Sequence, residues 1–598
     1  MAKSTSRPRT KPSSSSVPRG QKRARLGQTL NALAARRAAR GAAATGFTSQ
    51  PEPRTIGSLA RGRQLIGGNF LLAGFLIEGR DRSPWDLAMP DPAFEEELHG
   101  FGWLDDLAAV GDRTARARAQ DWVFGWIDRY GRGTGAGWQP DLTGRRVIRW
   151  INNALMILHA QDKPKADAFF AALGAQTTYL AKRWKAAPPG LPRFEALTGL
   201  IYASLSLTGM QGHSAQALAG LAAECATQID IEGGIATRNP EELLEVLTLL
   251  NWAKAAIETT GGTPSAPHLS AIERITPTLR ALRHADGGLA RFHGGEAGLP
   301  DRIDQTLVET GLRQGPTGNL AMGFARLHGG GTTLIMDADK PPKGPASSDA
   351  HASTLAFELT SRRRPIIVNC GSGAQFGRDW HRAGRATPSH STLALVEYSS
   401  SRLGPERSFG RSPHHWLEET PELVWAVRDE DSGQSWTAGH DGYSPTHGLT
   451  HLRRLSLSTD GKLLEGLDSL SSATPQGQKR LLTILEREGL HGIPYQIRFH
   501  LHPDADATLD MGGHAVSVVL KSGEIWVFRH DEQLELALEP SVFLEKGRLR
   551  PRATQQIVLS GRLLDEKCQI SWTFTKAQDR SAGIRDLQSG ADRDDSDT

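Results

Sequence analysis

The chain has 598 residues, which is too long for a single core and suits two or three domains. Hydrophobic residues make up 38% and charged residues 23%, and only three cysteines occur, far apart. These values exclude a disulfide framework and a cysteine-ligated metal centre as the organising features.

The net charge of +4 hides a strong asymmetry. Residues 1–45 carry eleven lysines and arginines and no acid, so the remainder carries −7, the difference between +4 and +11. The basic segment is rich in Ser, Pro and Ala ("KPSSSSVPRG"), a composition that cannot bury enough apolar area to order itself. We therefore expect residues 1–45 to be a basic disordered leader. It could contact an anionic membrane or nucleic acid, although a solvated tail is the favoured alternative because no aromatic residues are interleaved for base stacking.

Targeting signals are not evident. The segment "LGQTLNALAARRAARGAAATG" has an arginine pair where the apolar part of a signal peptide should run unbroken. No stretch of about 18 apolar residues occurs, so no membrane span is expected. The predicted location is the cytoplasm or the cell envelope.

Residues 46–315 are predicted to form the helical domain, with helical periodicity from about residue 55 to 290 and a Gly-rich segment, "HADGGLARFHGGEAGLPDRIDQ", predicted to be a linker. In "RRVIRWINNALMILHA" the apolar residues recur at spacings of three and four, which places them on one helical face. "NPEELLEVLTLLNWAKAAIETTGG" has Asn239 as a candidate N-cap, Pro240 at the first helical position and glycines at its end. Several helices of similar length joined by short loops predict paired helical hairpins, as an array or a closed ring.

Residues 316–578 alternate between apolar and polar residues. "TLAFEL", "RPIIVNCG", "STLALVEY", "YQIRFHLHP" and "EIWVFRH" are predicted strands, and "STDGKLL" is a predicted hairpin turn. No helical pattern of strand-connecting length is apparent between them, which favours antiparallel sheets in a sandwich or stack. Residues 579–598 are polar and are predicted to form a frayed tail.

Motifs in both halves resemble one known family. The helical part contains "GWQPDLTGRRVIRWINN" and "HADGGLARFHGG", and the strand part contains "HASTLAFELTSRRRPIIVNCG", "RATPSHSTLAL" and "IRFHLHPD". In this order they resemble the heparinase II/III-like proteins over roughly residues 65–575. The resemblance implies an N-terminal (α/α) toroid followed by a C-terminal antiparallel β-sandwich, a multidomain α and β protein.

The same resemblance implies a polysaccharide lyase that cleaves a uronic-acid-containing polymer by β-elimination. A base removes the C5 proton, another group neutralises the neighbouring carboxylate, and an acid protonates the leaving oxygen. Cations suit the carboxylate because charge develops there, and His or Tyr suits the proton transfers because their pKa values can be tuned.

The toroid departs from the family pattern at two places. Active members carry an Asn-His pair near the middle of the toroid, where this chain has "GLPRFEAL" with Arg193. They carry a Tyr on a later helix, where this chain has "GGIATRNPEELLEV" with Arg238 and no Tyr. Both arginines are predicted to bind substrate carboxylates or sulfates through their planar guanidinium groups.

The sandwich keeps more of the pattern. His351 begins "HASTLAFEL", and Arg385 and His390 match the family element that contains an arginine and a later histidine. The resemblance implies His351 and His390 as catalytic residues, with Arg385 as a charge clamp. Trp380, in the same polar loop, could stack on a sugar face.

No cofactor and no metal are predicted. Some relatives bind a structural metal through His and Asp near His351, but Ser353 replaces the aspartate here. Asp349, two residues before His351, is the remaining carboxylate that could complete such a site.

Three functions stay open from the sequence. The first is a polysaccharide lyase with an acidic polysaccharide as its partner. The second is a non-catalytic protein that binds an acidic polysaccharide on the same scaffold, which the missing Asn-His pair and Tyr favour. The third is a glycoside hydrolase, which would need two paired carboxylates from candidates such as Glu242, Glu245 and Asp286.

Overall fold

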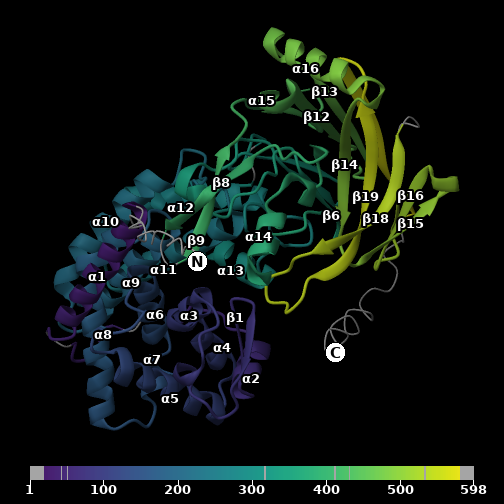
Figure 1. Cartoon of the computed structure of the whole chain (residues 1–598). Helices are drawn as coiled ribbons and strands as arrows, with labels where there is room; N and C mark the ends of the chain where they lie inside the picture. Colours follow the sequence, from purple (N-terminus) through teal and green to yellow (C-terminus); the bar gives the residue numbers. More distant parts are fainter. Residues whose placement is uncertain are drawn as a thin grey trace, which may run out of the picture.

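Helices and sheets form two lobes of the molecule (Figure 1). The computed structural model describes residues 19–41, 44–49, 52–315, 318–409, 412–429, 431–530 and 534–578. The change from helices to strands falls between Glu309, the end of α13, and Phe324, the start of β3. The expected boundary at residues 315–316 lies in this interval.

The first lobe is built from helices that pack on their sequence neighbours, with one small hairpin of strands. Its helices are α1 (Arg19–Ala38), α2 (Leu59–Ile66), α3 (Pro92–Gly100), α4 (Gly102–Val110), α5 (Arg113–Tyr130), α6 (Pro140–Asn152), α7 (Ala154–Leu158), α8 (Lys163–Arg183), α9 (Leu191–Ser206), α10 (Ser214–Gln228), α11 (Pro240–Thr259), α12 (Ala266–Ala281) and α13 (Pro300–Glu309). The hairpin is β1 (Asn69–Leu72) with β2 (Phe75–Glu78). Among the described residues, no helix combines the length and apolarity that a membrane span needs.

Helices α6 and α9 cross at a pair of glycines. A Cβ added to Gly199 would lie 2.5 Å from Gly144 Cα, and one added to Gly144 would lie 2.2 Å from Glu195 O. Backbones can approach this closely only where no side chain intervenes. The two glycines therefore sit inside helices because the crossing requires them.

The capping signals of α11 are confirmed. Asn239 Oδ1 accepts hydrogen bonds from the backbone N–H groups of Glu241 and Glu242, at 3.0 and 3.1 Å, and Pro240 occupies the first turn. An N-cap side chain satisfies donors that the helix itself cannot satisfy.

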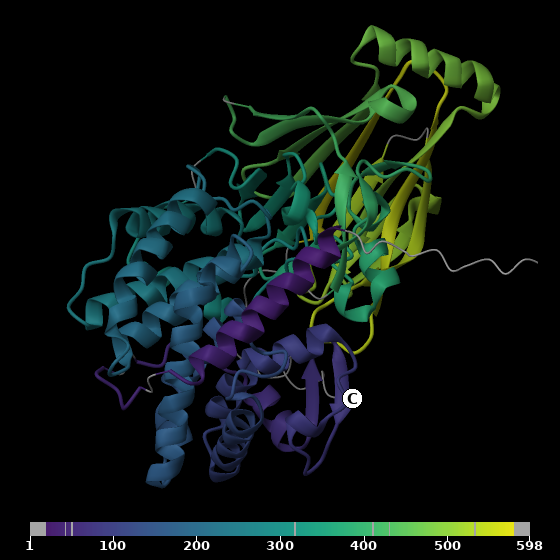
Figure 2. The same cartoon turned by 60° about the vertical axis from the view of Figure 1, so that its left-hand side comes forward.

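Helix α1 corrects the expectation of a disordered leader. Arg19–Ala38 is helical and lies along α8, where Arg183 Nε donates to Asn31 Oδ1 at 2.7 Å. Ala35 and Ala38 are buried in the core of the helical lobe. Figure 2 shows α1, in purple, lying across that lobe. The prediction is wrong for residues 19–41, because α1 packs through small residues rather than a stripe of large ones; residues 1–18 lie outside the described residues.

The second lobe contains two large antiparallel sheets. The first has the order β10 (Val424–Arg428), β11 (Ser435–Tyr443), β12 (Leu449–Leu457), β13 (Leu463–Ser471), β20 (Lys567–Gln578), β17 (Ile525–His530), β16 (Ala515–Leu520) and β15 (Ala505–Asp510). The second has the order β18 (Glu535–Phe543), β19 (Arg552–Leu563), β14 (Ile493–Leu501), β6 (Arg364–Val368), β5 (Phe357–Ser361), β4 (Thr332–Asp337) and β3 (Phe324–Gly329), and β7 (Leu393–Leu395) also pairs with β14. A separate hairpin joins β8 (Arg402–Phe409) and β9 (Ser412–Glu419).

The two sheets face each other across a shared core. Phe357 of β5 stacks on Trp572 of β20, with ring centroids 5.8 Å apart and an interplanar angle of 9°. Gly466, opposite Trp572 in the register of β13 and β20, leaves room for the indole, since an added Cβ would lie 2.0 Å from its ring. The prediction of an antiparallel sandwich is confirmed.

The second lobe also contains helices that the alternating pattern concealed. Besides the short α15 (Ser444–His447), α16 (Pro475–Glu488) separates β13 from β14, so the expectation that no helical segment interrupts the strands is wrong. Thr474 Oγ1 accepts from Gly477 N at 3.1 Å and caps α16, with Pro475 in the first turn. The polar loop before His390 contains α14 (Arg378–Gly384), and the strand after His390 is only three residues long.

Candidate functional site

Two predicted catalytic residues meet in the interior. His351 Nδ1 lies 3.0 Å from His390 Nε2, and His390 Nδ1 lies 2.8 Å from Ala386 O. A carbonyl can only accept, so His390 carries its proton on Nδ1 and accepts from His351 through Nε2. His351 precedes β5 and His390 precedes β7, so the two sequence motifs converge on one pair.

Burial governs the chemistry of this pair. His351 is 2% exposed and His390 is fully buried. Burial lowers the pKa of His390 to about 4, against the raising effect of Ala386 O. Burial and the neighbouring His390 lower the pKa of His351 well below its ordinary value. Both rings are therefore neutral near pH 7, and among the described residues His351 Nε2 has no hydrogen-bond partner.

Arg385 is held by backbone carbonyls. Its Nε donates to Ala350 O at 2.7 Å, one terminal nitrogen donates to Ser347 O at 2.7 Å, and the other donates to His415 O at 2.9 Å. The side chain is 3% exposed, and burial lowers its pKa to about 10. Its guanidinium thus fixes the segment before His351 in place.

Arg238 connects the two lobes through an acid that the sequence did not single out. It precedes α11 and donates to Asp337 Oδ1, at the end of β4, at 2.7 Å. It also donates to the carbonyls of Met322, Gly323 and Lys340. Burial alone would raise the pKa of Asp337, but Arg238 and His293 hold it well below its ordinary value.

His293 completes this second group and was also missed. Its Nε2 lies 3.4 Å from Asp337 Oδ2, and its Nδ1 accepts from the backbone N–H of His351 at 3.2 Å. Ser353, in the position where the family has an aspartate, donates to Asp337 Oδ2 at 2.6 Å. The sequence signal for this residue was the histidine in "RFHGG", but the Gly-rich composition around it led to the prediction of a linker.

Two other predicted binding residues lie apart from the histidine pair. Arg193, in the first turn of α9, pairs with Glu224 at 3.2 Å and donates to Ala187 O. Trp380, on α14, is 37% exposed. Trp380 is therefore the predicted site residue with the most open surface, while Arg193 is held within the helical lobe.

The residues near His351 do not fit a metal centre. Asp349 pairs with His381, Oδ1 to Nε2 at 3.3 Å, and Ser353 offers a hydroxyl in place of a carboxylate. Within the described ranges, no group of three or more His, Cys, Asp or Glu side chains could hold a metal ion.

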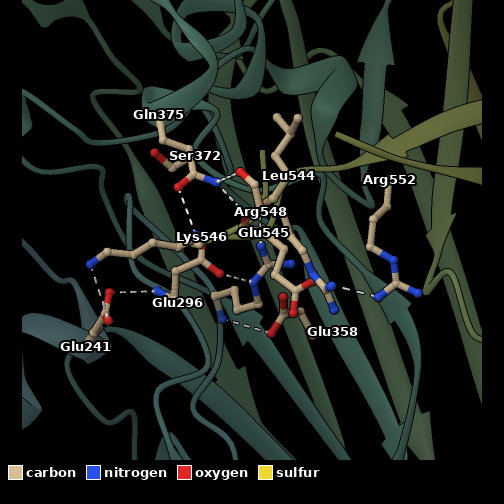
Figure 3. A network of polar contacts seen from close by, with 12 residues as sticks. Glu241, Glu296, Glu358, Ser372, Gln375, Leu544, Glu545, Lys546, Arg548 and Arg552 are labelled. Carbon is tan, nitrogen blue, oxygen red and sulfur yellow. Dashed lines mark hydrogen bonds and ion pairs between the residues drawn. The ribbon is translucent and has the colours of Figure 1, made fainter. Parts of the chain in front are cut away.

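Carboxylates gather where the lobes meet (Figure 3). Lys546, in the turn between β18 and β19, lies 3.8 Å from Glu241 of α11, and Glu241 accepts from the backbone N–H of Glu296. Arg291 Nε donates to Glu296 at 3.0 Å, and another of its nitrogens donates to Leu544 O at 2.7 Å. Each cation of this network is thus paired with an acid or a carbonyl, and the network ties the β18–β19 turn to the helical lobe.

The acids considered for hydrolysis have other partners. Glu245 pairs with Arg302 at 2.5 Å, and Asp286 accepts from Gly288 N at 2.9 Å. Glu242 is half-buried, and its desolvation raises its pKa to about 7, with Asp349 adding to the rise. Glycoside hydrolysis needs two carboxylates free to act on the substrate, and Glu245 and Asp286 are both engaged by other groups.

All six tyrosines contact groups other than the histidine pair. Three tyrosines form a hydrogen bond to a backbone carbonyl or a cysteine sulfur. Two pack through their rings against a histidine, and one lies near charged residues. The contacts are Tyr179 to Trp138 O, Tyr443 to Leu393 O, Tyr495 to Cys568, Tyr130 to His99, Tyr398 to His447, and Tyr202 near Arg54 and Glu309.

Comparison with known proteins agrees with this architecture. The family model for the heparinase II/III-like C-terminal region matches residues 315–573. The chain is 33% identical over 550 residues to FtsZ-localized protein C of Caulobacter vibrioides, covering 89% of this chain and 91% of that protein. The chain belongs to the heparinase II/III-like family, and within it shares this extended similarity with FtsZ-localized protein C.

Solved structures share the fold. The crystal structure of heparinase III superposes with a TM-score of 0.65 at 12% identity, covering 93% of this chain and 92% of that chain. A mutant of the heparan sulfate lyase HepC from Pedobacter heparinus superposes with a TM-score of 0.54 at 13% identity, covering 94% and 92%. The scaffold is that of a polysaccharide lyase, an (α/α) toroid followed by an antiparallel sandwich, as the sequence predicted.

Proposed function

We propose that this chain is a non-catalytic member of the heparinase II/III-like family that localises with FtsZ. The observation that carries the proposal is the closure of the predicted proton-transfer site. His351 and His390 are buried and bonded to each other. The location rests on the 33% identity, over most of both chains, to a protein named for its localisation with FtsZ.

The chemistry of elimination explains why closure matters. A base must come within hydrogen-bond distance of the proton that it removes, and a cation must face the carboxylate where charge develops. His390 uses both ring nitrogens inside the protein, and Arg385 donates to three carbonyls. His390 has no ring nitrogen to spare for a uronate, and Arg385 is only 3% exposed, so on this proposal the predicted catalytic and clamping roles give way to structural ones.

Location follows from the same proposal. Two locations were predicted for the protein, the cytoplasm and the cell envelope, and we propose that it lies in the one that contains FtsZ. An acidic polysaccharide stays a candidate ligand because the scaffold is that of polysaccharide lyases, and retention on immobilised heparin would measure it. No role for the basic residues 1–18 enters the proposal.

The test is the position of a fluorescent fusion in the cells that produce this protein. We expect the fusion to follow FtsZ through the division cycle and to disperse when FtsZ is depleted. A fusion that stays dispersed while FtsZ forms its usual structure contradicts the proposed location. A fusion of the helical lobe alone is not a suitable probe, since Arg238 and Arg291 bond across the two lobes.

Lyase activity is the second candidate, and one atom favours it. His351 Nε2 has no partner among the described residues, so it is the nitrogen that a substrate would meet if the site opened. Elimination leaves a 4,5-unsaturated uronate that absorbs in the ultraviolet. That absorbance separates the two candidates without reference to location.

A further inference from the structure

The outer end of the sandwich contains a second candidate site. A hollow of about 510 Å³ lies between α16 on one side and α15 with the residue Tyr398 on the other. Figures 1 and 2 both show α16 at the end of the sandwich that points away from the helical lobe. The hollow is therefore distinct from the histidine pair and from the network in Figure 3.

The lining of this hollow is cationic. Lys479, Arg480 and Arg487 of α16 face it together with His447 of α15, and none of the nine lining residues is acidic. Arg480 donates to the carbonyls of Ser444 and Pro445, at 2.8 and 2.6 Å, which fixes the guanidinium without neutralising it. Among the described residues, neither Lys479 nor Arg480 forms an ion pair.

Helix α16 holds these cations in a fixed pattern. Arg480 anchors the helix to α15, and Leu481 beside it is fully buried in the sandwich core. Within the part of the chain that the structure describes, Arg487 forms its one ion pair with its neighbour Glu488, at 3.0 Å, and both side chains lie at the surface. Helix α16 carries three cations and two acids, Glu486 and Glu488. The cations line the hollow and the acids do not, so the local field in the hollow favours an anion.

We propose that this hollow binds an acidic peptide segment of a partner protein. The cations and the hydroxyls of Thr446 and Thr483 suit carboxylates, and the aliphatic Ile484 suits an apolar side chain between them. This binding site goes beyond the proposed function and does not depend on which protein supplies the segment.

The walls favour a peptide over an acidic sugar. A sugar ring binds best on an open aromatic face, and Tyr398 is the aromatic residue of the lining. Its ring contacts His447 at 4.6 Å, and the Arg402 guanidinium lies over it at 5.7 Å. The face that a sugar would need is therefore partly occupied, while Lys479 has no ion-pair partner among the described residues and Arg480 is bonded to carbonyls alone.

The test is binding of a short fluorescein-labelled peptide, rich in glutamate with one phenylalanine, to the full chain by fluorescence anisotropy. A peptide with glutamine in place of glutamate is the matched probe. The pocket variant is Lys479→Glu with Arg487→Glu. The control variant is Arg113→Glu with Lys163→Glu, which changes the net charge equally at exposed first-turn positions of α5 and α8.

We expect the acidic peptide to bind the wild type and the control variant with the same affinity. Its affinity for the pocket variant should be lower by about tenfold or more. The glutamine peptide should bind poorly to all three, and raising the salt concentration should weaken the specific binding. Lys479→Gln with Arg487→Gln should show the same direction with a smaller effect, which guards against a folding defect from charge reversal.

Three outcomes overturn the proposal. Absence of binding to the wild type removes the site. Equal binding to the pocket variant places the peptide elsewhere, for example on the basic N-terminal residues. Binding of heparin oligosaccharides that depends on Lys479 and Arg487, with no binding of the peptide, makes the hollow a saccharide site.

Discussion

His390 is enclosed by one group from its own motif and one from the motif that begins at His351. Ala386 O and His351 Nδ1 occupy its two nitrogens, and its side chain has no exposed surface. A side chain in this setting fills core volume and satisfies buried partners. On the proposed function the motif marks a structural pair, whereas the resemblance implies a catalytic one.

Replacing His390 with Ala should lower the free energy of unfolding by about 2–4 kcal/mol, because it leaves a cavity and two unsatisfied buried groups. Equilibrium unfolding in urea measures this change. His491→Ala, at an exposed position, is the matched control and should change stability by less than about 0.5 kcal/mol. An unaltered unfolding curve for His390→Ala would show that the ring is not part of the core.

The buried histidines should make the fold sensitive to acid. The pKa of His390 is about 4 in the folded chain, below the value of about 6.5 expected in the unfolded chain. Below pH 6.5 the unfolded chain binds a proton that the folded chain does not, so stability is complete above that pH and falls as the pH falls toward 4. The loss for this one group is roughly 3 kcal/mol at pH 4.

Unfolding free energies measured from pH 7 to pH 4 test this expectation. His390→Gln removes the titrating group and should flatten the curve over that window relative to the wild type. His500, whose pKa is lowered to about 3 by burial, should keep part of the slope in the variant. A wild-type curve without slope between pH 6.5 and 4 would contradict the assignment of neutral buried rings.

Among the elements, α1 shows what hydrophobic periodicity misses. Its buried face is formed by alanines, and its leucines at positions 26, 30 and 33 are exposed. A search for large apolar residues at helical spacing therefore finds the wrong face. The close contact is backbone to backbone, since a Cβ added to Gly133 would lie 2.4 Å from Arg36 N.

Deleting residues 1–41 should lower the thermal midpoint by several degrees, because it uncovers the face of α8 and the Arg183 guanidinium. Deleting residues 1–18 alone leaves α1 intact and serves as the matched comparison. Differential scanning fluorimetry reports both midpoints. Equal midpoints for the two deletions would show that α1 adds nothing to the stability of the fold.

The α6–α9 crossing should be equally specific. Gly199→Ala places a methyl group 2.5 Å from Gly144 Cα and should cost about 1–3 kcal/mol as the helices separate. Gly102→Ala, in α4 with no atom within 4 Å of the new Cβ, should be neutral or slightly stabilising. Thermal unfolding of both variants checks the pair, and equal midpoints would contradict a close crossing.

At the scale of the whole molecule, the sequence predicted the architecture better than the site. Period-two strands and the capped helix α11 are local signals, so both lobes and their order could be predicted. Asp337 and His293 could not, because β4 and the segment before α13 meet only through the fold. Burial of Arg385 could not be predicted either, since its carbonyl partners carry no sequence signal.

The central claim is that this lyase scaffold does not perform elimination. The direct measurement is ultraviolet absorbance of purified full-length protein incubated with heparin, heparan sulfate, alginate, pectate and an acidic capsule, with an active lyase as the positive control. We expect no absorbance from unsaturated uronate on any polymer, even after prolonged incubation. Absorbance that rises with protein concentration, and that disappears in a folded His351→Gln variant, would contradict the claim and make His351 a catalytic residue.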